Sequence, residues 1–67
     1  MEIFKNGTKA YVAIYKTEAS SAEALTIANK HFKTRKDDLE IQSGTIKGDT
    51  LTIGKGKVWV VSRKERS

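Results

Sequence analysis

The stretch SSAEALTIANKHF, residues 20–32, decides the fold because it has the apolar spacing of a helix and strand-like sequence on both sides. Ser20 and Glu23 stand in the S-x-x-E arrangement of a capping box, which marks a helix start. At 3.6 residues per turn, one broad stripe of this helix collects Ala24, Leu25, Ile27, Ala28, His31 and Phe32. The small alanines in the stripe would let the helix axis approach a sheet closely. We therefore expect one face of the helix to pack on strands.

The chain before the helix is predicted to form a β-hairpin. Asn6-Gly7 is the strongest turn signal in the sequence, because both central positions of a type I′ turn need positive φ. We expect this turn to join residues 2–5 to residues 8–16. Side chains on a strand alternate between its two faces. The aliphatic face, which we expect in the core, carries Ala10, Val12 and Ile14, and the opposite face carries Tyr11 and Tyr15 as cross-strand packing or a stacking surface.

Three strands are expected after the helix. Leu39 and Ile41 occupy odd positions whereas Ile46 is even, so a common face requires a one-residue slip. We place that slip as a β-bulge at Ser43-Gly44. Turns at Gly48-Asp49 and at residues 54–56 would then fold the rest of the chain into a three-strand meander.

The last expected strand, residues 57–63, is apolar on both faces. Val58 and Val60 alternate there with Trp59 and Val61. This pattern indicates either a central strand or a face that a partner covers. Trp59 is accordingly either a core residue or an exposed contact residue.

Together these elements predict an α+β fold in the order β-β-α-β-β-β. One helix packs on a four- or five-stranded, mainly antiparallel sheet. A chain of 67 residues has room for one small core. We therefore expect residues 1–67 to form a single small domain, with residues 63–67 as a frayed polar tail.

Composition narrows the cellular setting. The chain has no cysteine, which removes a disulfide framework and any thiolate nucleophile and fits a reducing, cytoplasmic location. Its first residues lack the apolar run of a signal peptide, and no segment approaches the roughly 18 apolar residues of a membrane span. We expect no membrane association.

No group of residues in the sequence demands a particular reaction. Residues 48–56 superficially resemble a P-loop, but five residues separate the glycines and no Ser or Thr follows Lys55. His31 is the single histidine, and packing or capping explains it. Asp37, Asp38 and Glu40 read as a solvated charge cluster beside basic residues. We therefore expect no enzyme activity, no metal and no cofactor.

Charge gives the main indication of function. Thirteen Lys and Arg against eight Asp and Glu give a net charge of +5, and the pI lies near 9.7. Such a balance favours polyanionic partners, although it also serves solubility. If the basic side chains converge, they would form a groove that contacts phosphates while an aromatic ring stacks on bases. The candidate nucleic-acid-binding residues are Lys30, Lys33, Arg35, Lys36, Lys55, Lys57 and Arg63, with Trp59 or Tyr15 for stacking.

Three segments also carry a family resemblance. TEASSAEALTIA at residues 17–28, DDLEI at 37–41 and a glycine-lysine hairpin that leads to KVWVV at 57–61 resemble the small N-terminal domain of the bacterial Jag proteins. The resemblance covers roughly residues 10–61, although the loop departs from the glycine-phenylalanine-rich pattern of that family. It implies a β-α-β-β core associated with RNA-binding machinery and transfers no functional residue.

Two functions of different classes follow. The first is a small non-enzymatic module that binds DNA or RNA by neutralising its backbone. The alternative is a protein-binding accessory factor, of the kind phages and mobile elements use to modulate a host protein, which acts through an edge strand or the Trp59 face. Homodimerisation through the same edge would help to stabilise so small a core.

Overall fold

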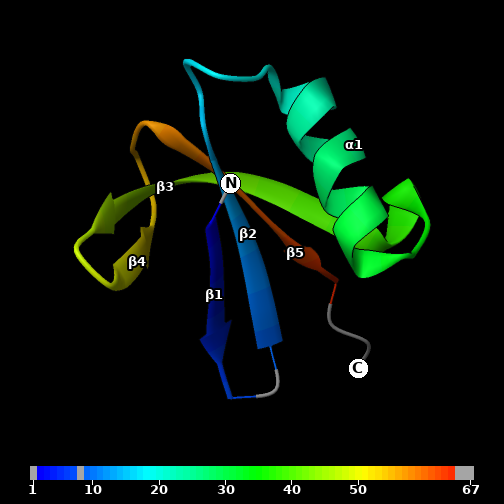
Figure 1. Cartoon of the computed structure of the whole chain (residues 1–67), viewed down its shortest axis with the longest axis horizontal. Helices are drawn as coiled ribbons and strands as arrows, with labels where there is room; N and C mark the ends of the chain where they lie inside the picture. The colour runs from blue at the N-terminus through cyan, green and yellow to red at the C-terminus, as the bar shows by residue number, and fades with distance from the viewer. Residues whose placement is uncertain (1, 8, 65–67) are drawn as a thin grey trace.

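The computed structural model describes residues 2–7 and 9–64, except the side chain of Lys36. Within this part of the chain, one α-helix and a five-stranded antiparallel sheet confirm the predicted α+β class (Figure 1). The elements in chain order are β1 (Glu2–Asn6), β2 (Lys9–Tyr15), α1 (Ser21–Phe32), the 3-10 helix η1 (Lys36–Asp38), β3 (Leu39–Lys47), β4 (Thr50–Ile53) and β5 (Val58–Arg63).

The strands lie in the order β1-β2-β5-β3-β4. β5 therefore occupies the centre of the sheet, between β2 and β3, which explains why both of its faces are apolar. The predicted meander is wrong, because β4 pairs with β3 and not with β5. The short β4 has mostly exposed side chains, which suit an edge, whereas the valines of β5 need cover on both sides. Residues 54–57 consequently form a connection from the edge to the centre rather than a hairpin turn.

One sheet face, called here the helix face, packs against α1. Ala24 and Ala28 are fully buried there against Val12, Ile14 and Val61. The predicted aliphatic face of β2 and the close approach of the helix are thus confirmed. Ser20 caps the helix as predicted, since its Oγ accepts a hydrogen bond from the Glu23 backbone N–H at 3.3 Å.

Two residues of the predicted helix stripe lie outside the core. Ile27 is 38% exposed, and His31 is also exposed and lies edge-on to Phe32. The stripe that the sheet covers is narrower than the predicted one, because contact is centred on the two alanines, where the helix axis comes closest. The outer edges of the stripe remain in solvent.

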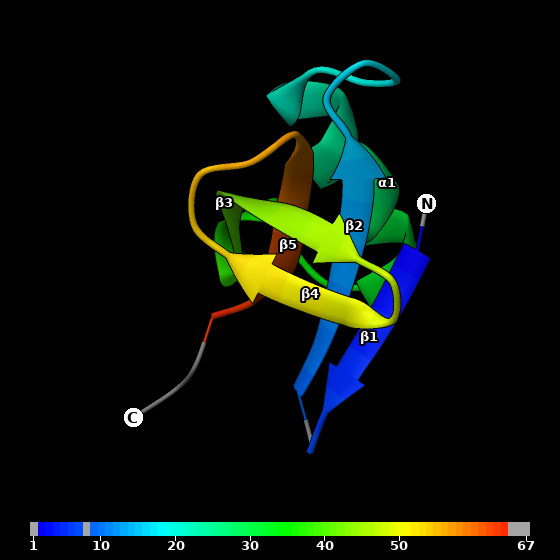
Figure 2. The ribbon, with the colours of Figure 1, turned by 90° about the vertical axis from the view of Figure 1, so that its left-hand side faces the viewer.

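The opposite sheet face, called here the hairpin face, is covered as well. β4 and the adjoining half of β3 cross over β2 and β1 on the side away from α1 (Figure 2). Ala13, Val58 and Val60 are buried on this face. Phe4 and Tyr11 of the first hairpin lie next to residues of β4. The sheet therefore has an apolar layer on each side, and Ile46 belongs to the second layer.

Gly44 is the residue at which β3 changes partners. Residues 39–44 pair with β5 and residues 44–47 pair with β4, without a break in either register. The predicted bulge is therefore wrong, because Ile46 reaches the apolar layer on the hairpin face without a one-residue shift in the strand register. Glycine is needed for close approach instead, because a Cβ here would lie 2.7 Å from both Thr52 O and Val60 Cγ2.

The first hairpin turns one residue later than predicted. Asn6 pairs with Lys9, so it belongs to β1, and Gly7 supplies the positive φ of 67°. Thr8 lies outside the described residues. The observed register places Phe4 directly opposite Tyr11, and such cross-strand aromatic pairs stabilise a hairpin.

Arg63 and Lys64, which were expected in a frayed tail, are held to the sheet. Arg63 is the last residue of β5, opposite Leu39. The Lys64 backbone N–H donates to Asp38 O at 2.7 Å, which fastens the end of β5 beside η1. Residues 65–67 of the expected tail lie outside the described residues.

Candidate functional site

The predicted cations do not form one groove but lie at both ends of β5. Lys57 precedes this strand and Arg63 ends it, so the two are about 20 Å apart at roughly 3.3 Å per residue. We call the cations near the end of α1 the helix-exit group and those near the β4–β5 connection the loop group. The helix-exit group comprises Lys30, Lys33, Arg35, Arg63 and Lys64, and the loop group comprises Lys16, Lys55 and Lys57.

Hydrogen bonds hold the backbone around the helix-exit group in place. Lys33 ends α1 in the left-handed conformation with φ 54°, and its N–H donates to Asn29 O at 2.9 Å. The Asn29 side-chain amide donates in turn to Thr34 O at 2.5 Å. The Asp38 N–H donates to Arg35 O at 3.0 Å, so the turn between α1 and β3 is fixed at both of its ends. Lys36 begins η1, and its side chain lies outside the described part.

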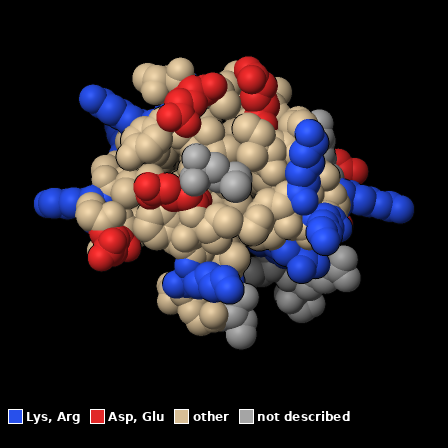
Figure 3. Space-filling model, in the orientation of Figure 1, with Lys and Arg blue, Asp and Glu red and all other residues tan. Residues whose placement is uncertain are grey.

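The side chains of the helix-exit group are exposed and have no acidic partner within the described residues. One ion pair forms among the described side chains, between Lys9 Nζ and Glu40 Oε1 at 3.8 Å. Asp37 and Asp38 follow Arg35 closely in sequence, and the Asp38 carboxylate accepts a hydrogen bond from Thr34 Oγ1. Figure 3 shows several Lys and Arg side chains together at the right-hand edge of the molecule, where α1 ends, with an acidic side chain beside them, while other Asp and Glu side chains lie at the top and on the left. Charge at the helix exit is therefore available to an anionic ligand.

The two predicted stacking residues lie on opposite sheet faces. Trp59 is half-buried on the helix face, and its Nε1–H donates to Ala19 O at 3.1 Å. Lys16 Nζ lies 4.5 Å from the centroid of the indole, so a cation already covers one face of that ring. Tyr15 is 42% exposed on the hairpin face. It borders an apolar cavity of about 320 Å³ beside Lys57, Val58 and Ile46. Tyr15 thus has the more accessible ring of the two.

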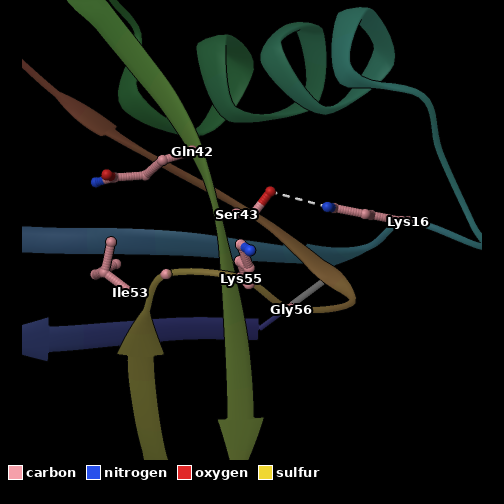
Figure 4. Close-up of a pocket in the computed structure, with 7 residues that line it drawn as sticks. Lys16, Gln42, Ser43, Ile53, Lys55 and Gly56 are labelled. Atoms are coloured by element: carbon pink, nitrogen blue, oxygen red, sulfur yellow. Dashed lines mark hydrogen bonds between the residues drawn. The ribbon is translucent and has the colours of Figure 1, made fainter.

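Sequence analysis did not find a polar arrangement that residues distant in sequence form together. A groove of about 510 Å³, called here the Lys16 groove, runs beside β3 and the β4–β5 connection (Figure 4). Lys16 Nζ donates to Ser43 Oγ at 2.8 Å across its floor. These two residues are 27 positions apart, and no local pattern marks them as neighbours. The groove is lined by Lys16, Gln42, Ser43, Ile53, Gly54, Lys55 and Gly56.

A third cavity, called here the edge pocket, lies between the two edge strands. It measures about 220 Å³ and is mostly apolar. The bend of the β3–β4 hairpin brings β4 over β1 and so creates this pocket. Its apolar lining comes from Phe4 and Tyr11 of the first hairpin and from Leu51 and Ile53 of β4.

Comparisons of this chain with protein-family models, with curated proteins and with solved structures find no match. The resemblance to the Jag domain stays a prediction. None of the helices in the described part of the chain has the length and apolar character that crossing a membrane requires. Likewise, no three His, Asp or Glu side chains gather into a possible metal site among the described residues. The geometry of the two basic ends is therefore the basis for a functional assignment.

Proposed function

We propose that this chain is a small non-enzymatic module that binds nucleic acid through the phosphate backbone. One observation carries the proposal. The helix-exit group presents five exposed cations from α1, the following turn and the end of β5, and none has an acidic partner in the described structure. Lysine and arginine side chains in this state gain most from a polyanion, because binding releases the counterions condensed on the nucleic acid.

The conformation of Lys33 supports the same assignment. It is the one described non-glycine residue with positive φ. A left-handed residue at a helix end is usually glycine, because a Cβ is crowded there. A lysine at this position costs stability but keeps a cation at the exit of α1. Backbone strain of this kind is characteristic of functional positions.

Binding of this type is independent of sequence and weakens with salt. We expect labelled random-sequence oligonucleotides, as single-stranded DNA, duplex DNA and RNA, to bind at low salt and to be released as salt rises. Fluorescence anisotropy at several salt concentrations gives the slope of log K against log salt. The double variant Lys30→Gln/Arg35→Gln should reduce that slope by about 1.5, because two phosphate contacts are lost.

The matched control is Lys5→Gln/Lys47→Gln, which removes the same charge from exposed positions in β1 and β3. This control should keep most of the wild-type slope. Equal weakening in both double variants would mean that net charge alone drives binding. Absence of binding at low salt, or an affinity indifferent to salt, would contradict the proposal itself.

The edge pocket favours a second candidate function, which is binding of another protein through the edge strands. Ile3 of β1 and Ile53 of β4 are each 43% exposed. Unpaired strand edges can accept an additional strand, and a neighbouring pocket can hold one of its apolar side chains. In contrast, the Trp59 face suits this function less well, because Lys16 and Ala19 already occupy the polar and π contacts of the indole.

This candidate is tested by capture from nuclease-treated bacterial lysate with three forms of the chain. A specific protein partner should be captured by the wild type and by Lys30→Gln/Arg35→Gln, and lost with Ile53→Lys. An exposed isoleucine tolerates lysine, so the variant should fold normally. Recovery of ribosomal and nucleoid proteins alone would contradict protein binding through this edge.

A further inference from the structure

We infer that the Lys16 groove is a binding site for the phosphate group of a ligand. The groove lies at the opposite end of β5 from the helix-exit group and shares no residue with it. The inference therefore stands whether or not the helix exit binds nucleic acid. It rests on three features of the groove, which are a fixed cation, a fixed loop and a lining without acidic side chains among the described residues.

The first feature is the fixed position of Lys16. Its Nζ donates to Ser43 Oγ at 2.8 Å and lies 4.5 Å from the Trp59 centroid. Trp59 is itself held by its hydrogen bond to Ala19 O. An exposed lysine normally loses much side-chain entropy when a ligand orders it. Here the ammonium group is already ordered, and of its three N–H donors one is used by Ser43, which leaves others for a ligand.

The second feature is the fixed backbone around Lys55. The Gly54 N–H donates to Ser43 O at 2.9 Å, and Thr45 Oγ1 donates to Lys55 O at 3.2 Å. Gly56 presses on β3 so closely that a Cβ would lie 1.9 Å from Gly44 O. Residues 54–57 have no regular secondary structure, yet they cannot move away from β3 without breaking these contacts. Lys55 therefore projects from a defined place.

The third feature is the charge of the lining. Among the described residues, two lysines line the groove and no Asp or Glu does. An anion bound between the two ammonium groups would be attracted to both of them. Figure 4 shows Ser43 facing Lys16, with the connection that carries Lys55 passing β3 next to them, whereas Gln42 points to the other side of β3. Because Ser43 Oγ accepts from Lys16, its own hydrogen is free to donate to the same anion.

These donors fit a phosphate better than a carboxylate. A phosphate monoester carries a charge of about −1.5 to −2 near neutral pH and three acceptor oxygens. It can therefore receive Lys16, Lys55 and the Ser43 hydroxyl together. Lysine binds phosphate as a point charge and needs no bidentate geometry. The phosphate could belong to a small phosphorylated molecule or to the backbone of a nucleic acid.

Trp59 makes the site measurable, because it is the single tryptophan of the chain. The test titrates inorganic phosphate while Trp59 fluorescence is recorded, at an ionic strength held constant with sodium chloride. An anion bound to Lys16 alters the charge next to the indole, so we expect a saturable change in emission. Amide shifts of Ser43 and Gly54, from nitrogen-15 spectra, should move along the same binding curve.

Variants locate the site. Lys55→Gln leaves the surroundings of Trp59 unchanged and should lower phosphate affinity roughly tenfold, as expected for loss of one charged hydrogen bond. Lys16→Gln should have at least that effect, read from the amide shifts because the variant alters the fluorescence itself. Lys47→Gln, which removes an equal charge at the end of β3, should bind phosphate as the wild type does.

A further binding experiment identifies the kind of molecule that carries the phosphate. If Lys16→Gln and Lys55→Gln also weaken binding of an oligonucleotide without terminal phosphates, the groove holds a backbone phosphate. If they weaken inorganic phosphate binding alone, the groove serves a small phosphorylated molecule. The inference is overturned if phosphate produces no saturable change beyond that of sodium chloride, or if all three lysine variants bind it equally.

Discussion

The two basic ends of β5 hold their charge in different ways. At the helix exit, hydrogen bonds fix the backbone, while the long side chains of Lys30 and Arg35 have no partner among the described residues. At the loop end, the ammonium group of Lys16 is itself held, by Ser43 and by the Trp59 ring. The first arrangement suits many phosphates along an extended polymer. The second suits one phosphate in one position.

This difference shows that the number of cations does not define a site. Side chains that remain free must lose rotamer entropy when they bind, which reduces the gain from each contact. A cation that the fold has already ordered avoids most of that loss. The helix exit is therefore expected to bind weakly and without selectivity, and the Lys16 groove to bind one group with defined geometry.

The largest effect is expected from Gly56→Ala. A Cβ at this position meets the Gly44 carbonyl and the Thr45 side chain, so the β4–β5 connection must shift. We expect a loss of about 3 kcal/mol in the free energy of unfolding, typical of overpacking. Urea denaturation measures this loss. At temperatures where the variant stays folded, phosphate binding in the groove should disappear while oligonucleotide binding at the helix exit persists.

Gly48→Ala is the matched control for that substitution. Gly48 has φ 60° but no atom within 4 Å of a Cβ. It should lose only about 1 kcal/mol, which is the cost of the left-handed conformation. If the two variants were equally destabilised, the contact of residues 54–57 with β3 would not be what holds Lys55 in place.

The opposite outcome is expected at the helix exit from Lys33→Gly. Glycine removes the steric cost of φ 54° at the end of α1. After the extra entropy of glycine in the unfolded chain is subtracted, we expect a gain of roughly 0.5 to 1 kcal/mol in stability. Thermal or urea unfolding measures it. Oligonucleotide affinity should fall at the same time, because a cation is lost.

Lys33→Ala separates strain from charge. It removes the same cation but keeps the crowded Cβ, so affinity should fall without any gain in stability. If Lys33→Gly bound nucleic acid as tightly as the wild type, the lysine would not be part of the contact surface. Phosphate binding in the Lys16 groove should not respond to either substitution.

Local patterns in the sequence predicted the parts of the fold that depend on neighbouring residues. The capping box and the alternation in residues 10–15 gave the helix, its buried alanines and the correct face of β2. The bulge predicted at Ser43-Gly44 was wrong, since both registers run through Gly44 without a break and this glycine permits close approach of Thr52 and Val60. A glycine in a strand supports either reading until the neighbouring strands are known.

The order of the strands depended on contacts between distant residues. β5 lies between β2 and β3 because this position buries the valines on both of its faces. A prediction that pairs strands from the turns between them does not take this burial into account. The Lys16 groove is even harder to predict from local sequence patterns. Lys16 and Ser43 meet across Trp59 because β2, β5 and β3 are neighbours in the sheet. The predicted basic set therefore contained Lys55 but neither of these two residues.

The smallest effect on stability is expected from Ser43→Ala, which tests whether the order of Lys16 matters. The hydrogen bond between the two side chains is exposed, so its loss should change the free energy of unfolding by less than about 0.5 kcal/mol. Phosphate affinity should nevertheless fall about threefold, since Lys16 loses its anchor and the ligand loses one neutral donor. Ser43→Thr keeps the hydroxyl and should retain most of the affinity. If Ser43→Ala bound phosphate as the wild type does, the groove would work like the helix exit, through charge alone, and the contrast between the two ends of β5 would not hold.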